Sequence, residues 1–287
     1  MSYFVLTGFS DEISPDFATQ LKEVAKLGIG YIEIRGVNGR NITDHTLDET
    51  YGIKKELDEA GIKVSAIGSP LGKIKIEDPF EPHMELMRHT VEQAKILDTR
   101  YIRIFSYFMD TTKADEYRDE VMHRTREFTK YAQSQDIILL HENEKEIYGD
   151  IPERCLELYK DMNSPNFKLI FDPANFVQCG VETYPHAFDM LKNYVAYMHI
   201  KDAVAGEGKV VPSGFGDGNI KKILAKLYKR GYEGFLSLEP HLGHFEGFDD
   251  LEGGNDLKFE EKSDAGKFQL AADSLKKIIT EVVDEQG

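Results

Sequence analysis

The chain has few cysteines, no long basic run and no long hydrophobic stretch, and each of these shortages excludes a class of protein. Its two cysteines, Cys155 and Cys179, provide neither a disulfide framework nor a zinc-type pairing. No stretch reaches the roughly 20 apolar residues that would span a bilayer. Residues 1–14 lack the basic region, apolar core and cleavage site of a secretory leader. We therefore expect a cytoplasmic protein.

Positive charge is also scarce relative to negative charge. The 287 residues include 35 Lys and Arg against 51 Asp and Glu, which gives a formal net charge of −16. A field of that sign repels phosphate backbones and anionic lipid headgroups, so we expect neither nucleic acid nor a membrane as partner. The same charge helps to attract a divalent cation. Hydrophobic residues make up 41% of the chain, which is enough for a sizeable core.

Strand-like and helix-like segments alternate eight times along the chain. The predicted strands cover residues 3–9, 31–36, 63–70, 101–107, 136–143, 167–173, 195–202 and 234–240. The predicted helices cover residues 16–28, 46–60, 82–97, 114–135, 151–162, 184–193, 219–230 and 264–283. This alternation is typical of parallel strands joined by crossover helices, and eight complete units favour a closed barrel over a doubly wound sheet. We predict one α/β domain over residues 1–287, a single (β/α)₈ TIM barrel with long loops (203–219 and 241–262) after strands seven and eight.

Each of the last four predicted strands ends in a hard metal ligand. The motifs HENE, FDPAN, MHIKD and SLEPH supply Glu142, Asp172, His199 and Glu239, at intervals of 30, 27 and 40 residues. Three carboxylates and one imidazole suit an octahedral divalent ion. One such residue alone could be a solvated loop acid or a helix cap. Four of them at matching ends of successive strands predict a metal site at the barrel mouth, where TIM barrels keep their active sites.

The four motifs and their order resemble the xylose isomerase-like TIM barrel superfamily, in its sugar phosphate isomerase/epimerase branch. The resemblance extends from GFSDEIS to the final helix. It implies one divalent metal ion held by Glu142, Asp172, His199 and Glu239, with Mn²⁺ preferred and Mg²⁺, Zn²⁺ or Co²⁺ as alternatives. It also implies that Glu142 and Glu239 act as a catalytic acid/base pair, and that the protein forms a homodimer or homotetramer.

Proton-transfer chemistry explains why such a site needs both a metal and two carboxylates. Removing the proton next to a carbonyl leaves an enediolate, which a metal bridging two substrate oxygens stabilises by several kcal/mol. A general acid and a general base each typically contribute about 10²–10⁴-fold. We therefore expect an isomerase or epimerase that moves a proton α to the carbonyl of a sugar or sugar phosphate through a metal-bound enediolate.

Two other functions are compatible with the same residues. A metal-dependent lyase or dehydratase acting on a keto-polyol or 3-keto-glycoside would remove the same α-proton and then expel a leaving group. A non-catalytic sugar-binding barrel is the alternative of a different class, and the pair Glu142 and Glu239 counts against it.

Several polar residues near the predicted mouth are candidates for substrate binding. Lys201 lies two residues after His199 on the same strand face, and His241 follows Glu239, with His244 further along the same loop. Lys201 could instead pair with Asp202 or Glu239.

Charged residues on strands two and four should also reach the interior. The isoleucines on either side of Glu33 and of Arg103 should pack against helices, so Glu33 and Arg103 should point inward. They are expected either to form a buried ion pair or to recognise substrate. Asp11 and Glu12 are interpreted as a helix-entry feature, although Glu12 could reach the mouth.

The chain departs from many superfamily epimerases at two positions. Asn175 and Glu144 stand where those enzymes carry histidines, so both are candidate substrate contacts and a simple free ketose is a less certain substrate. Missing histidines and the lack of a basic face also argue against the DNA-repair endonuclease branch. The glycine-rich loop 206–218 has two interpretations. It could bind phosphate, with help from Lys209 and Asn219, or it could be a flexible loop at the mouth.

Overall fold

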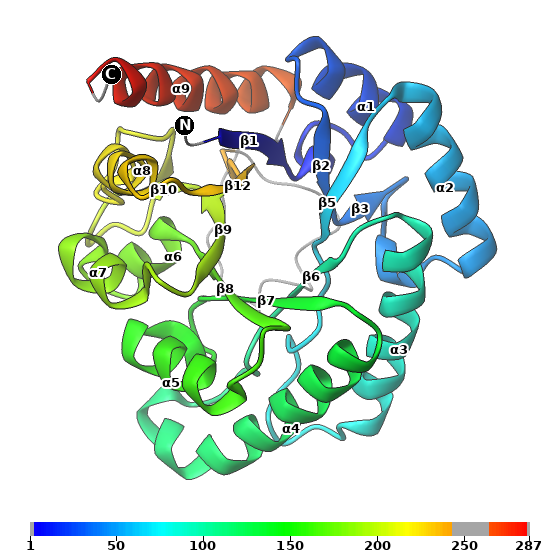
Figure 1. Ribbon diagram of the computed structural model, residues 1–287, viewed down its shortest axis with the longest axis vertical. Helices are drawn as coiled ribbons and strands as arrows, with labels where there is room; N and C mark the ends of the chain where they lie inside the picture. Colours follow the sequence, from blue (N-terminus) through cyan, green and yellow to red (C-terminus); the bar gives the residue numbers. More distant parts are fainter. Residues whose placement is uncertain (1–2, 243–263, 286–287) are drawn as a thin grey trace.

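A computed structural model of the chain describes residues 3–242 and 264–285. Eight parallel strands form a nearly closed barrel with helices around its outside (Figure 1), which confirms the predicted (β/α)₈ fold. The barrel strands are β1 (Tyr3–Gly8), β2 (Tyr31–Ile34), β5 (Lys63–Ile67), β6 (Tyr101–Ile104), β7 (Ile138–Glu142), β8 (Phe167–Phe171), β9 (Val195–Ile200) and β12 (Glu233–Leu238). Their hydrogen-bonded order is β1-β12-β9-β8-β7-β6-β5-β2, and β1 contacts β2 at the remaining seam.

Nine helices lie outside the strands in the described part of the chain, and some of them begin or end at capping residues. They are α1 (Phe17–Lys26), α2 (Leu47–Ala60), α3 (Glu81–Ile96), α4 (Ala114–Ser134), α5 (Pro152–Met162), α6 (Pro173–Gln178), α7 (Phe188–Leu191), α8 (Ile220–Lys229) and α9 (Ala265–Asp284). Thr46 and Glu49 form a reciprocal capping box at the start of α2, and Gly61 ends that helix in the left-handed conformation. Pro152 occupies the first turn of α5, where its missing N–H costs no hydrogen bond.

The lower part of the barrel interior is apolar. Ala66, Leu140, Ile170 and Tyr197 form a buried cluster inside the strands. Above it, the parallel register of β9 and β12 places Ser237 opposite His199. Because side chains alternate along a strand, the next inward positions of these strands lie one layer closer to their carboxyl ends. The polar residues therefore gather on an apolar floor at the mouth.

The structure differs from the sequence expectation at strand ends and in one connection. The expected strands 63–70 and 101–107 stop at Ile67 and Ile104, because the backbone N–H groups of Phe105 and Tyr107 bond to the carbonyls of Leu71 and Gly72 in the loop after β5. The expected helix at 184–193 is a π-helical turn (Thr183–Ala187) followed by α7, and α6 precedes both.

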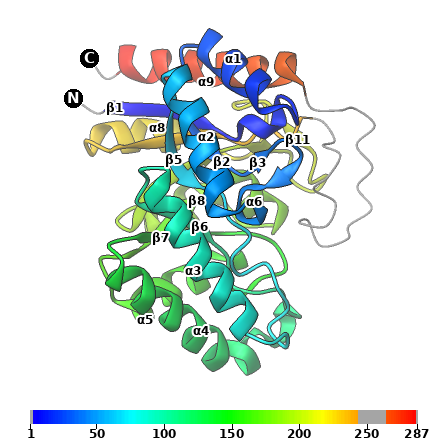
Figure 2. The same cartoon turned by 90° about the vertical axis from the view of Figure 1, so that its right-hand side faces the viewer.

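Short hairpins extend the barrel at its mouth. Strands β3 (Gly36–Val37) and β4 (Arg40–Asn41) follow β2, and strands β10 (Asp202–Ala203) and β11 (Val210–Val211) follow β9. Figure 2 shows β3 and β11 at the end of the barrel toward which β1 runs. The long loop expected after strand seven is thus partly a hairpin. Of the loop expected after strand eight, residues 243–262, including His244, lie outside the described residues.

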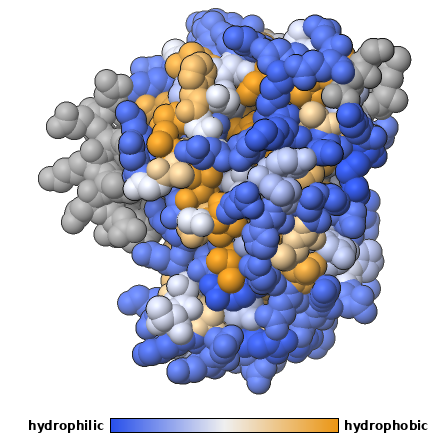
Figure 3. Space-filling model, turned by 90° about the vertical axis from the view of Figure 1, so that its left-hand side faces the viewer, coloured by the Kyte–Doolittle hydropathy of each residue, from blue (hydrophilic) through white to orange (hydrophobic). Residues whose placement is uncertain are grey.

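The outer surface is largely hydrophilic. On the face shown in Figure 3, hydrophobic side chains lie in small groups among hydrophilic ones. Every helix within residues 3–242 and 264–285 is too short or too polar to cross a membrane.

Helix α9 packs on the outside of the paired first and last barrel strands, β1 and β12. The Phe268 side chain is fully buried, and its ring packs so closely on β1 that a Cβ added at Gly8 would lie 2.9 Å from Phe268 Cζ. We predict that Phe268→Ala lowers the free energy of unfolding by about 3–5 kcal/mol, because it leaves a cavity at this contact. Leu270→Ala, on the same helix but 51% exposed, should change it by less than about 0.5 kcal/mol. Urea denaturation of both variants would check this, and equal losses would contradict the assigned role of α9.

Candidate metal centre at the barrel mouth

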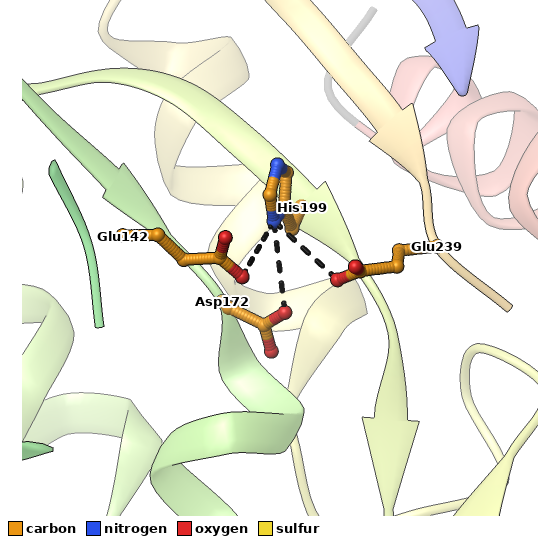
Figure 4. A group of neighbouring side chains, drawn as sticks. All are labelled: Glu142, Asp172, His199 and Glu239. Atoms are coloured by element: carbon orange, nitrogen blue, oxygen red, sulfur yellow. Dashed lines mark hydrogen bonds and ion pairs between the residues drawn. The ribbon is translucent and has the colours of Figure 1, made fainter. Parts of the chain in front are cut away.

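Four ligand-type side chains converge at the carboxyl ends of successive strands. Glu142 ends β7, Asp172 follows β8, His199 lies on β9 and Glu239 follows β12. Each offers one ligand atom, and these four atoms all lie within 4.8 Å of one another. All four residues are buried. Figure 4 shows Glu142 and Glu239 approaching from opposite sides, with His199 and Asp172 between them.

The spacing of these atoms fits a single divalent ion. His199 Nδ1 lies 2.9 Å from Glu142 Oε1, 3.5 Å from Glu239 Oε2 and 3.8 Å from Asp172 Oδ2. Octahedral ligands about 2.1 Å from a common ion lie about 3.0 Å apart when adjacent and about 4.2 Å apart when opposite. The three distances, from 2.9 to 3.8 Å, are close to this range.

One buried oxygen in the cluster also lacks a hydrogen bond. Asp172 Oδ2 has no hydrogen-bonding partner, although Lys201 Nζ lies 3.2 Å away as a charge contact without hydrogen-bond geometry. Buried polar atoms are rarely left in this state. The residues present therefore fit a metal ion and could hold one.

Local backbone structure aims Asp172 into the centre. Asp172 is the N-cap of α6: its Oδ1 accepts a hydrogen bond from Asn175 N (2.9 Å), which leaves Oδ2 facing the other ligands. Asn143 fixes the same residue from the side, because its side chain donates to Asp172 O and accepts from Asp172 N, both at 2.9 Å. The motif residues Asn143, Pro173 and Asn175 thus serve to orient one carboxylate.

His199 is held from behind by a second carboxylate. Its Nε2 lies 3.2 Å from Glu33 Oε2, and Ser237 Oγ donates to the same oxygen at 2.6 Å. With Nε2–H donated to Glu33, the hydrogen-bond network assigns the Nδ1 side of the ring to the other three ligands. Glu33 therefore lies on the far side of the imidazole from the centre and is paired with His199 and Ser237 rather than with Arg103.

Three buried cations surround the carboxylates. Arg103 Nη1 lies 3.1 Å from Glu142 Oε2, and Arg35 Nη1 lies 3.3 Å from Glu239 Oε1. Lys201 Nζ lies 3.0 Å from Glu239 Oε2. Each glutamate thus presents one oxygen to the centre while a guanidinium holds the other.

These contacts shift the pKa values in opposite directions. Burial acts to raise the pKa of Glu142, but His199 and Arg103 outweigh it and hold that pKa at about 2. Burial raises the pKa of Asp172 to about 7 despite the nearby Lys201. Burial acts to lower the pKa of His199, but Glu142 and Glu33 outweigh it and raise that pKa well above its usual value. A divalent ion would take the place of protons held by Asp172 and His199.

The remaining sequence candidates lie around the centre at different depths. Asn175 is buried, and its Nδ2 donates to Asn143 O (2.9 Å) and Glu142 Oε1 (3.3 Å). Glu144 is half-buried at the rim, 3.8 Å from Lys73 Nζ. His241 is also at the rim, with a side chain 25% exposed, and its Nε2 lies 3.4 Å from Glu12 Oε1 and 3.5 Å from Glu239 Oε1.

Sequence reasoning missed the part that Arg35 plays here, whereas it allowed for Glu12 at the mouth. Arg35 donates from Nε to Asp11 Oδ2 at 2.8 Å and reaches Glu239 across the β1–β12 side of the barrel. Glu12 accepts a hydrogen bond from His241 N at 2.8 Å, so it joins the mouth as well as the helix-entry turn. Because side chains alternate along a strand, Arg35 falls on the same face as Glu33, but nothing local in the sequence indicates its partners.

Comparison with known proteins agrees with this geometry. The family model described as xylose isomerase-like TIM barrel matches residues 21–278. The chain belongs to the xylose isomerase-like TIM barrel family. An uncharacterised protein of Methanocaldococcus jannaschii, MJ1311, is 25% identical over 166 residues, which is 54% of this chain; the match spans only about half (56%) of that curated relative.

Solved structures of the family share the whole barrel at low sequence identity. A D-tagatose 3-epimerase-like protein has a TM-score of 0.76 at 17% identity, with 99% of this chain and 100% of that chain covered. The probable 3-DHS dehydratase AsbF of Bacillus anthracis has a TM-score of 0.71 at 20% identity, with 96% and 99% covered. A Mycobacterium smegmatis barrel protein in complex with magnesium has a TM-score of 0.68 at 16% identity, with 97% of each chain covered. At these identities the likeness shows the fold.

The contact between Glu33 and His199 leads to a prediction about metal affinity. Glu33→Gln removes the charge that favours Nε2–H, so Mn²⁺ should bind about 10–100-fold more weakly. Titration followed by the electron paramagnetic resonance of free Mn²⁺ would measure this. Ser65→Ala is a matched control, because Ser65 is a buried polar residue of the same barrel that bonds Thr7 and Tyr197 rather than His199. Equal effects of the two variants would refute a specific role for Glu33.

Proposed function

We propose that this protein is a divalent-metal-dependent isomerase or epimerase that moves a proton α to the carbonyl of a sugar or sugar derivative. One observation carries the proposal: two buried glutamates approach the ligand group from opposite sides, each through one oxygen (Figure 4). A substrate seated between Glu142 and Glu239 would have a base on one face and an acid on the other. That arrangement is what removal and return of an α-proton requires.

Glu142, Asp172, His199 and Glu239 would hold the ion. Mn²⁺ is our first choice, Mg²⁺ has support from the magnesium complex of the mycobacterial neighbour, and Zn²⁺ and Co²⁺ are alternatives. When bound, such an ion supplies Lewis-acid stabilisation of the negative charge that develops on the substrate oxygens, which is worth several kcal/mol.

The protein's own residues handle the proton and orient the substrate. Contacts with cationic groups hold the pKa of Glu142 at about 2 and that of Glu239 well below its usual value, so both are bases as they stand. One glutamate takes the α-proton, and the other returns to the opposite face a proton that it has first taken up from solvent, each step contributing about 10²–10⁴-fold. Arg103 and Arg35 hold the second oxygens of Glu142 and Glu239, so each carboxylate keeps one direction of approach. Burial of the whole group lowers the local dielectric constant and strengthens these interactions.

Substrate recognition is assigned to residues at and just above the ligand group. Lys201 lies beside the Asp172 and Glu239 oxygens, where it could bind a substrate oxygen. Glu144, His241, Asn175 and Arg103 are the other proposed contacts. Glu33 is assigned to the support of His199. The homodimer or homotetramer and the cytoplasmic location remain predictions.

A metal-dependent dehydratase or other lyase is the second candidate. Asn175 and Glu144 stand where many epimerases of the superfamily carry histidines, and Asn175 donates to Glu142 and Asn143. A product lighter than its substrate by one water would select the dehydratase, whereas an isomer of unchanged mass would select the epimerase.

A pair of variants separates proton transfer from metal binding. At saturating Mn²⁺, Glu239→Gln should lower the rate of solvent-deuterium incorporation into a ketose substrate by about 10²–10⁴-fold, because the acid/base group is gone. Asp172→Asn should mainly raise the Mn²⁺ concentration needed for half-maximal exchange and should recover more activity as Mn²⁺ is added.

Mass spectrometry of the labelled sugar would provide both measurements. If excess Mn²⁺ restored both variants equally, Glu239 would be a ligand without an acid/base role. Another outcome is that the wild-type protein exchanges no deuterium with any member of a panel of ketoses and keto-sugars, while both variants bind those sugars as tightly as the wild type does. A non-catalytic sugar-binding role would then replace the enzyme proposal.

A further inference from the structure

The loop after β9 contains an anion-binding arrangement of backbone N–H groups. Barrels often bind phosphate with the loops after strands seven and eight. Successive N–H groups in glycine-rich turns form concave sites for anions. Here the N–H groups of Gly214, Gly216 and Gly218 point to one place, and we call these three groups the glycine nest.

The protein fills the glycine nest with a carboxylate of its own. Asp202 Oδ2 accepts from Gly214 N (2.9 Å) and Gly216 N (3.1 Å), and Oδ1 accepts from Gly218 N (2.8 Å) and Ala203 N (3.0 Å). Asp202 is fully buried. A Cβ added at Gly216 or Gly218 would lie 2.4 Å or 2.7 Å from Asp202 Oδ1, so the space around the carboxylate is filled.

The side-chain amide of Asn219, which flanks the loop, is also committed. Asn219 Nδ2 donates to Thr183 Oγ1 (3.1 Å) and Asp217 O (2.9 Å). Lys209 is exposed beside β11, where its carbonyl accepts from Val204 N. A phosphate group arriving at this loop would have to displace Asp202 from four backbone N–H groups.

The cations of the described part of the mouth are likewise engaged by carboxylates. Arg103 pairs with Glu142, Arg35 with Asp11 and Glu239, and Lys201 with Asp172 and Glu239. Lys73 lies 3.8 Å from Glu144 Oε2 at the rim. Recruiting one of these buried cations for a dianion would leave a buried carboxylate unpaired, which is strongly unfavourable.

What the mouth offers instead suits hydroxyl groups. Glu144 and Glu12 present carboxylates, Asn175 an amide and His241 an imidazole, all of which can accept hydrogen bonds from a polyol. The carboxylate of Glu144 at the rim repels an anion.

We propose that the substrate is an uncharged polyhydroxy carbonyl compound rather than a sugar phosphate, and that Asp202 occupies the place a phosphate would take. This inference rests on the proposed function for its carbonyl chemistry. Its statement about charge rests on the glycine nest and the paired cations alone.

The first test compares a free ketose with its terminal phosphate ester in the same deuterium-exchange assay, with D-fructose and its 6-phosphate as one pair within a ketose panel. The free sugar of an active pair should exceed its ester in kcat/KM by at least about 100-fold. A preference for the ester overturns the inference. If no pair exchanges, the proposed function fails, and the second test still decides the question of charge.

The second test is calorimetric titration of inorganic phosphate into the Mg²⁺-loaded full chain. The wild-type protein should show no saturable binding tighter than about 10 mM, and Asp202→Ala should gain such binding because it empties the glycine nest. Asp217→Asn is the matched control, since Asp217 Oδ2 holds Ala205 N in the same loop at 2.7 Å without filling the nest.

Either of two results overturns the proposal. One is saturable phosphate binding by the wild-type protein, which needs no variant to fold. The other is a folded Asp202→Ala protein, with a cooperative thermal transition, that binds phosphate no better than Asp217→Asn does.

Discussion

The imidazole of His199 is the element on which the rest of the centre depends. Its Nε2 faces Glu33, supported by Ser237, and its Nδ1 faces the carboxylates of Glu142, Asp172 and Glu239. A ring held on one edge can present only the other edge to an ion, so a contact behind the histidine fixes the geometry in front of it.

Charge balance is the second constraint at the mouth. Burying this many carboxylates would be prohibitive without compensation. Arg35 and Arg103 supply part of that compensation through the outer oxygens of Glu239 and Glu142, and Lys201 supplies another part beside the inward oxygens of Glu239 and Asp172. His199 and Arg103 hold the pKa of Glu142 low, whereas burial raises the pKa of Asp172, so Asp172 is the less compensated of these two carboxylates. A divalent cation would complete it.

The sequence predicts the fold and the ligand positions because both depend on local patterns. Alternating strands and helices define eight barrel units, and strand-end residues of a parallel barrel must meet at one rim. The partners of Glu33 and Arg35 were not predictable in this way. Glu33 meets His199 across 166 positions, and Arg35 meets Glu239 across 204, so no periodicity records either contact. The role of Asp202 was not predictable for a related reason. The sequence of a glycine-rich loop does not indicate whether its backbone N–H groups bond to solvent, to a ligand or to another residue of the chain.

The position of β12 between β1 and β9 determines when the site comes into existence. Glu239 follows the last barrel strand, and its partner Arg35 follows the second. During synthesis, a chain that has not yet released β12 from the ribosome carries three of the four ligands on an open sheet. The fourth arrives only when the final strand docks against β1 and β9. An ion that needs all four ligands could therefore bind only once the barrel is complete.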